Sequence, residues 1–149
     1  VAYTGGGGFS PGLDHPGVFV ASGDTSAPAR FIAAVRGVLA ESMEAPPLQG
    51  ELTRAKEKTL NSFVFNFASN EAQLNRIISY ELFGLPQDYL FKYRDGVVGT
   101  SGSDVLAAAR RHLHLGRQQI VVVADTKQTE EDLRALGFPV VHLDVDNEI

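Results

Sequence analysis

Apolar residues in the middle of the chain recur with the period of an α-helix. They fall on one stripe over Ala29–Met43, and again over about Gly50–Phe67. A third stretch with this period runs from Ser69 or Asn70 through Phe83, and the glycine that follows is typical of a helix C-terminus. We therefore predict three successive helices. The stripe of the third consists of Leu74, Ile77, Ile78 and Leu82.

Capping and turn residues indicate where the third helix begins and predict a fourth and a fifth helix. Gln73 completes a capping box on Asn70 at the start of the third helix. Pro86 suits the first turn of a fourth helix. The Ser101–Asp104 segment starts a fifth helix that reaches about His112.

The N-terminal part of the chain shows the pattern of two strands. Val1–Phe9 is short and ends in glycines, whereas Gly17–Gly23 is apolar, β-branched and bounded by turn residues. The Gly5–Pro16 stretch between them is rich in turn formers. This arrangement predicts a loose hairpin.

The C-terminal part changes period again. Gln119–Ala124 is a continuous apolar run, which predicts a strand in the middle of a sheet. Thr129–Leu136 predicts a short helix closed by Gly137, and Pro139–Val145 alternates as an edge or half-buried strand would. Five helices clustered between strands favour a single α+β domain over residues 1–149.

Composition narrows the function classes. The 149 residues are 44% hydrophobic and include no cysteine, so disulfides and thiolate metal sites are excluded. No apolar run approaches the roughly 20 residues of a membrane-spanning helix. Lysine and arginine total 13 against 18 acidic residues, which is not the charge balance of a nucleic-acid-binding protein. The acidic excess lies after residue 124, and the basic clusters Arg54/Lys56/Lys58 and Arg110/Arg111 are expected on solvated helix faces.

Residue types that carry chemistry do not form a self-contained catalytic set. None of the four histidines has a helical metal-ligand spacing, and His142 is expected to face solvent. The Glu130/Glu131 pair is expected to be solvated as well. The run Gly5–Gly8 invites a nucleotide-binding interpretation, but it lacks the following helix and lysine of a phosphate-binding loop. The alternative for these glycines is flexible backbone near a partner or ligand.

Several short motifs occur together in a fixed order. Glu51-Leu52-x-x-Ala55-Lys56 precedes Gln73–Arg76 and Ser79–Pro86, and then come Asp88–Tyr93 and Ile120–Asp125. The Gly17–Thr25 segment adds a "G-x-F-x-x-x-x-G-T" pattern. Over about residues 1–125 the chain thus resembles the C-terminal domain of pitrilysin/insulinase-family zinc peptidases, and is most similar to the bacterial members that resemble mitochondrial processing peptidase.

The resemblance implies a fold and a division of labour. The fold would be the LuxS/processing-peptidase-like metallohydrolase fold, in which a helical layer covers an antiparallel sheet, here truncated at its N-terminus. The N-terminal domain of such enzymes binds zinc through His-x-x-Glu-His and a downstream glutamate, and the C-terminal domain has no metal. We therefore expect no cofactor in this chain, zinc in an N-terminal or partner domain, and a peptide or protein as substrate.

The family motif "R-x-x-x-G-L-A-Y" assigns one residue a catalytic role. Val1-Ala2-Tyr3 matches its end, so the resemblance places Tyr3 at the substrate carbonyl in the intact protein, while the arginine would fall before Val1. Gly5, Gly6, Gly7 and Gly8 would then line the substrate chamber. Without the resemblance, Tyr3 would be an aromatic residue that fills core space, and Tyr80, Tyr89 and Tyr93 remain expected core or interface residues.

Two functions stay open from these residues. One is the non-metal domain of a zinc endopeptidase, inactive alone. The other is a structural or assembly subunit that kept the fold and lost the chemistry. Loss of preceding strands would expose a sheet edge, so we expect a dimer or larger species.

Overall fold

A computed structural model describes residues 2–10, 12, 16–124 and 126–143 of the chain. It confirms the α+β class, because it is 61% helical and contains a small two-stranded antiparallel sheet. The chain divides into two compact units, one of residues 1–10, 18–40 and 114–149, and the other of residues 11–17 and 41–113. The single domain expected over residues 1–149 stays a prediction.

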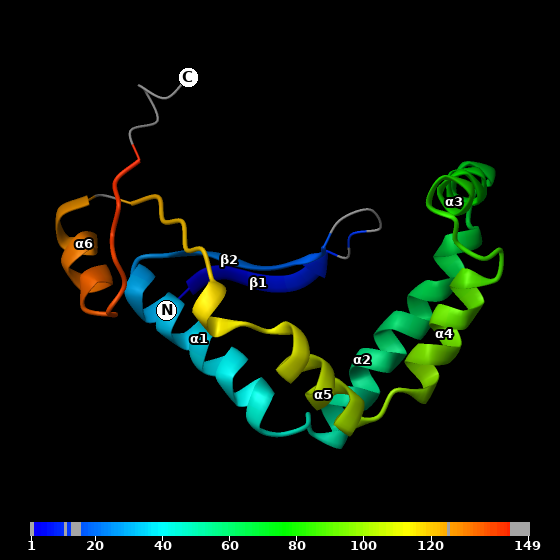
Figure 1. Ribbon diagram of the computed structural model, residues 1–149, viewed down its shortest axis with the longest axis horizontal. Helices are drawn as coiled ribbons and strands as arrows, with labels where there is room; N and C mark the ends of the chain where they lie inside the picture. The colour runs from blue at the N-terminus through cyan, green and yellow to red at the C-terminus, as the bar shows by residue number, and fades with distance from the viewer. Residues whose placement is uncertain (1, 11, 13–15, 125, 144–149) are drawn as a thin grey trace. The chain divides into compact units, whose positions relative to one another are not determined.

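The first unit begins with the predicted hairpin (Figure 1). Strand β1, Ala2–Ser10, pairs antiparallel with β2, Val18–Thr25. The glycines were expected in the connection, and this was wrong: Gly5, Gly6, Gly7 and Gly8 lie within β1, opposite Gly23, Ser22, Ala21 and Val20. Pairing along the whole of β2 fixes the glycine backbone, although glycine by itself weakens a strand. Part of the expected connection, residues 11 and 13–15, lies outside the described residues.

Helix α1, Pro28–Glu44, follows the hairpin and confirms the helix predicted over Ala29–Met43. The Thr25 hydroxyl accepts a hydrogen bond from the backbone N–H of Ala27 at 3.0 Å, just before the helix begins. In the predicted stripe Leu39 is buried and most other members are partly buried, whereas Val38 is 62% exposed. The predicted period therefore identifies the correct packing face of α1.

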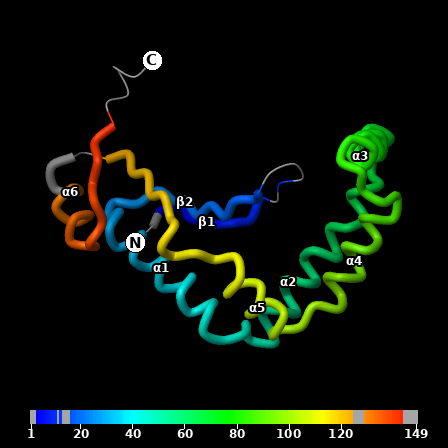
Figure 2. The backbone as a smooth tube through the Cα atoms, viewed as in Figure 1, coloured from blue at the N-terminus to red at the C-terminus, as the bar shows by residue number. Residues whose placement is uncertain are grey.

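The apolar segment Gln119–Ala124 does not form the predicted strand. It runs as an irregular trace between the short 3₁₀ helix η2, Leu115–Arg117, and helix α6, Thr126–Arg134 (Figure 2). Val121 is 80% and Val123 98% exposed. β-branched residues favour a strand only where a neighbouring strand packs and pairs with them, and within the described residues the sheet consists of β1 and β2 alone.

The end of the chain also departs from expectation. The described part of the predicted strand Pro139–Val145, residues 139–143, is irregular, and residues 144 and 145 lie outside the described residues. The preceding helix is confirmed, but it spans Thr126–Arg134 instead of the predicted Thr129–Leu136, and Gly137 follows it with φ +81°. Arg36 links this region to α1, since its guanidinium donates to the carbonyl of Leu115 at 3.2 Å and lies over the ring of Phe138.

The second unit is helical. Helix α2, Gln49–Ser62, gives way to a 3₁₀ helix, η1, over Phe63–Phe67, so the α-helix predicted through Phe67 ends five residues early. Within η1 the Asn66 side chain donates to the carbonyl of Phe63 at 2.9 Å, which favours the tighter turn. Helices α2 and α4 lie side by side, and the Lys56 ammonium donates to the carbonyl of Val98 at 2.8 Å.

Three further helices complete this unit: α3, Asn70–Phe83; α4, Tyr89–Gly99; and α5, Gly102–His112. The side chain of Ser69 caps α3 by accepting from the N–H of Ala72, so the capping box on Asn70 with Gln73 was wrong. Pro86 precedes α4 by three residues instead of standing in its first turn, and its carbonyl accepts from the N–H of Tyr89. Gly84 ends α3 with φ 63°, as predicted.

Burial is low throughout the described residues. Leu39 and Tyr80 are the only hydrophobic residues among them that are buried. The stripe of α3 that the periodicity identifies is exposed: its four members range from 50% to 73%. Clustered exposed apolar side chains are typical of surfaces that bind a protein, a membrane or a ligand.

Candidate functional site

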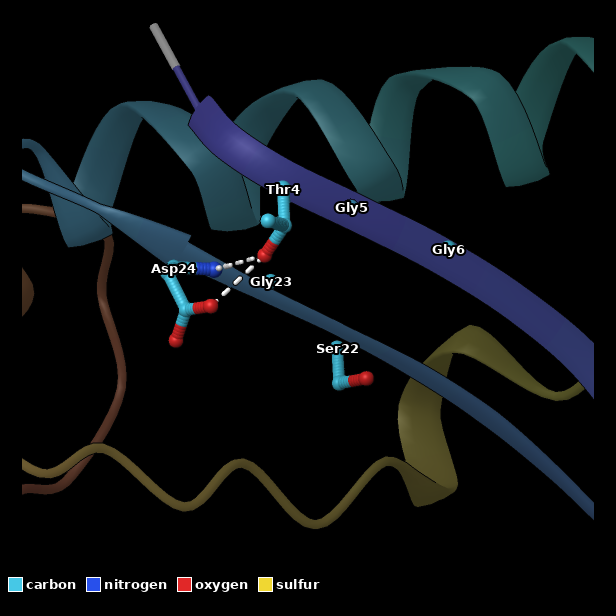
Figure 3. Close-up of a pocket in the computed structure, with 6 residues that line it drawn as sticks. All are labelled: Thr4, Gly5, Gly6, Ser22, Gly23 and Asp24. Atoms are coloured by element: carbon cyan, nitrogen blue, oxygen red, sulfur yellow. Dashed lines mark hydrogen bonds between the residues drawn. The ribbon is translucent and has the colours of Figure 1, made fainter.

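The hairpin carries an open depression of about 320 Å³ near the start of β1. Thr4, Gly5 and Gly6 line it from β1, and Ser22, Gly23 and Asp24 line it from β2 (Figure 3). The strand pairing sets this composition, because it places Thr4 opposite Asp24, Gly5 opposite Gly23 and Gly6 opposite Ser22. Three of the six residues have no side chain, so the backbone itself is accessible there.

The polar corner of the depression is a cross-strand pair. The Thr4 hydroxyl donates to a carboxylate oxygen of Asp24 at 2.6 Å and accepts from the backbone N–H of Asp24 at 3.3 Å (Figure 3). Both residues are exposed. The hydrogen bond from Thr4 on β1 holds the Asp24 carboxylate at the edge of the depression, where it is the only charged group among the six lining residues.

The two faces of the hairpin differ. Phe31 of α1 lies beneath Gly5 and Gly23: a Cβ placed on Gly23 would come within 2.6 Å of the ring, and one on Gly5 within 3.5 Å. Side chains alternate along a strand, so Gly6 and Ser22 point to the other face. A Cβ on Gly6 or Gly8 meets nothing within 4 Å. The open face is therefore flat backbone flanked by Thr4, Ser22 and Asp24.

The predicted site residues are only partly brought together. Gly5 and Gly6 line the depression, but Gly7 and Gly8 lie further along β1, with Gly7 close to the ring of Phe19. Tyr3 directly precedes the lining residue Thr4 and is 81% exposed, so it does not fill core space. Of the other tyrosines, Tyr80 is buried, whereas Tyr89 and Tyr93 are 40% and 52% exposed.

Sequence reasoning missed the polar members, Thr4, Ser22 and Asp24. Their positions depend on the register of the two strands, which places Thr4 opposite Asp24 and Gly6 opposite Ser22. With Gly5–Gly8 assigned to the connection, the predicted first strand was too short to include these pairs.

A second polar cluster lies at α6. The Glu130 carboxylate accepts hydrogen bonds from the Arg134 guanidinium and is 3.0 Å from Nε2 of His142. The Arg134 hydrogen bond, followed by that of His142, lowers the pKa of Glu130 below its ordinary value of 4.5. Glu130 is thus half-buried and paired, unlike the solvated residue that was expected, while His142 remains exposed as predicted.

The described residues contain no group of three or more histidine, cysteine, aspartate or glutamate side chains that could hold a metal ion. None of their helices is long and apolar enough to cross a membrane.

Comparison with known proteins gives no assignment. No protein-family model matches the chain, and no curated protein matches it either.

Proposed function

We propose that this chain is the non-metal domain of a zinc metalloendopeptidase of the pitrilysin/insulinase family, which binds and orients a peptide opposite a zinc-bearing domain. The observation that carries the proposal is the ordered series of motifs from Glu51–Lys56 through Ile120–Asp125. Each motif alone is short. Their shared order and spacing over most of the chain is what supports the family.

The geometry of the hairpin is compatible with the role given to Tyr3. Its side chain is exposed at the start of β1, next to a depression lined mainly by glycine and small polar residues. A phenol in that position can donate a hydrogen bond to the substrate carbonyl oxygen as negative charge develops on it. Zinc, held by the other domain, would supply the activation of the attacking water.

We further propose that the small sheet is one part of the larger, helix-covered sheet of the processing-peptidase-like fold. The exposed β-branched residues of Gln119–Ala124 support this, because such a run needs a neighbouring strand to pair with. The hairpin has only two strands among the described residues, and isolated two-stranded hairpins are marginally stable in water. An open sheet edge also supports a dimer or larger species.

A catalytically inactive structural or assembly subunit of the same fold is the second candidate. A chain without a self-contained catalytic set is compatible with both candidates. A His-x-x-Glu-His motif in the same polypeptide upstream of this chain, or in a neighbouring gene, would favour the peptidase instead, because that motif supplies the zinc ligands and the base.

The proposal is tested by replacing Tyr3 with phenylalanine in the intact protein. Loss of one donor to a developing oxyanion lowers kcat by about 10²-fold or more, so we expect a fall of that size with zinc content unchanged. Tyr93→Phe serves as the control, since Tyr93 is also exposed but lies on α4. Unchanged peptide turnover in Tyr3→Phe would remove Tyr3 from the catalytic role.

A further inference from the structure

Helix α3 presents a second apolar face whose side chains are at least half exposed. Four large aliphatic residues, spaced as i, i+3, i+4 and i+8, share this face. Their exposed fractions are 57% for Leu74, 50% for Ile77, 52% for Ile78 and 73% for Leu82. We call these four residues the α3 stripe.

The opposite face already holds α3 in place. Tyr80 is buried, and its hydroxyl accepts a hydrogen bond from the backbone N–H of Leu90 at 3.1 Å. Arg76 lies over the ring of Phe67 at 4.8 Å, and Ser79 and Phe83 are half-buried on the same side. Because this face attaches the helix to its own unit, the α3 stripe is not needed for that attachment.

Two carboxylates accompany the stripe. Successive helical residues are about 100° apart, which places Glu71 and Glu81 on the same side of α3 as Leu74 and Ile78. Both are exposed, and neither forms an ion pair with a described residue, although Glu81 accepts a hydrogen bond from the side chain of Gln87 at 3.1 Å. The surface is therefore apolar with negative charge at its two ends.

This charge argues against two possible occupants. Antiparallel packing of two copies on the stripe brings Glu71 of one copy within about one helical turn of Glu81 of the other, and like charges at that spacing repel. An anionic lipid surface would be repelled for the same reason. A partner that places positive charge beside an apolar stripe avoids both penalties.

We propose that the α3 stripe docks an amphipathic helix of a partner protein whose apolar residues are flanked by lysine or arginine. Helices that bind in this way use anchors spaced i, i+3, i+4 and i+7. Leu74, Ile77 and Ile78 have the first three of these spacings, and Leu82 follows at i+8. The residues from 74 to 82 span about 12 Å of helix axis, enough for two to three turns of the partner. The α3 stripe shares no residue with the hairpin site, and its docking role does not rest on the function proposed for that site.

The test uses the full chain and two designed peptides of about four turns. Both peptides carry the same leucine stripe, flanked by lysine in one and by glutamate in the other. Nuclear magnetic resonance titration should show the lysine peptide shifting the amide signals of α3 and binding at least about tenfold more tightly than the glutamate peptide. Added salt should reduce the difference.

Substitutions distinguish peptide binding at the α3 stripe from nonspecific binding to exposed apolar residues. Leu82→Asn should weaken the lysine peptide about tenfold or more, whereas Leu48→Asn should not, because Leu48 is equally exposed at 73% but lies before α2. The double variant Glu71→Lys, Glu81→Lys should reverse the preference between the two peptides. This reversal keeps the proposal testable if Leu82→Asn does not fold.

Four results would overturn the proposal. The first is equal or absent binding of the two peptides, and the second is a preference that the double variant does not reverse. The third is a molar mass by light scattering that falls in Leu82→Asn but not in Leu48→Asn, which assigns the stripe to a second copy. The fourth is binding to anionic phospholipid vesicles that only Leu82→Asn abolishes, which assigns it to a membrane.

Discussion

The contact between Phe31 and the hairpin depends on a missing side chain at Gly23. A Cβ there would lie 2.6 Å from the Phe31 ring and 2.6 Å from the carbonyl oxygen of Thr4. Only one of these neighbours is a side chain that can move, and the other is backbone. We therefore expect Gly23→Ala to lower the free energy of unfolding by about 1–3 kcal/mol, measured by urea denaturation.

Gly6→Ala is the matched control, because it lies in the same hairpin on the open face and its Cβ would meet nothing within 4 Å. It should leave the free energy of unfolding unchanged or slightly raised, since alanine restricts the unfolded chain. Equal effects of the two substitutions would mean that Phe31 does not pack on Gly23.

Tyr80 is the second residue whose role the structure makes specific. Its buried hydroxyl accepts from the N–H of Leu90, which ties α3 to the start of α4. Tyr80→Phe leaves that N–H without its partner and should lower the free energy of unfolding by about 1 kcal/mol. Tyr93→Phe, on a side chain that is 52% exposed, should have no effect in the same denaturation experiment.

At the scale of elements, helix α5 begins with a capping box that the sequence predicts. The side chain and backbone N–H of Ser101 donate to the Asp104 carboxylate at 2.6 and 2.8 Å, and the Ser101 hydroxyl accepts from the N–H of Asp104 at 3.2 Å. These hydrogen bonds lower the pKa of Asp104 below its ordinary value of 3.8. The cap is thus strongest when the carboxylate is ionised.

The pH dependence of α5 follows from that direction. A lowered pKa means that the stabilisation is present above pH 3.8 and is lost as the pH falls through the lowered value. The protection factors of the α5 amides, which correct for the intrinsic pH dependence of exchange, should therefore fall at acid pH in the natural protein, and Asp104→Asn should remove this acid-dependent part. Glu57→Gln, at an exposed position of α2, should leave the profile unchanged. If Asp104→Asn had the same pH dependence of α5 amide protection as the natural protein, the Asp104 cap would not be its cause.

Helices and strands differed in how far the sequence could predict them. Helical period, Gly84 and the Ser101 cap are local signals, so α1, α3 and α5 match their predicted ranges closely. Gln119–Ala124 has the composition of a strand, but a strand also needs a partner that its own sequence does not specify. The opposite holds for Gly5–Gly8. These residues have the composition of a turn, but they form a strand because they pair with β2.

The candidate site, like the helices and strands, could be predicted from the sequence only in part. Tyr3, Gly5 and Gly6 came from the resemblance and lie at or beside the depression. Thr4, Ser22 and Asp24 depend on cross-strand register, which is set by pairing and not by local pattern. Phe31 could not be anticipated at all, because its place under Gly23 depends on how α1 packs against the hairpin.

At the scale of the whole molecule, the exposed apolar residues support a chain that acts with other protein. The hairpin, the Gln119–Ala124 segment and the α3 stripe each leave large apolar side chains at least half exposed, including Val20, Val121 and Leu82. Soluble monomers rarely expose such surface without a binding role. In the function proposed above, a zinc-bearing partner would cover part of this surface, and the partner proposed for the α3 stripe would cover another part.

The most direct test of the account combines zinc analysis with peptide hydrolysis for three samples: this chain alone, the zinc-bearing part of its intact protein alone, and the two together. We expect no tightly held zinc and no hydrolysis from this chain alone, and hydrolysis of a fluorogenic peptide only when both parts are present. About one zinc tightly bound per copy of this chain, or hydrolysis unchanged by its omission, would contradict the account.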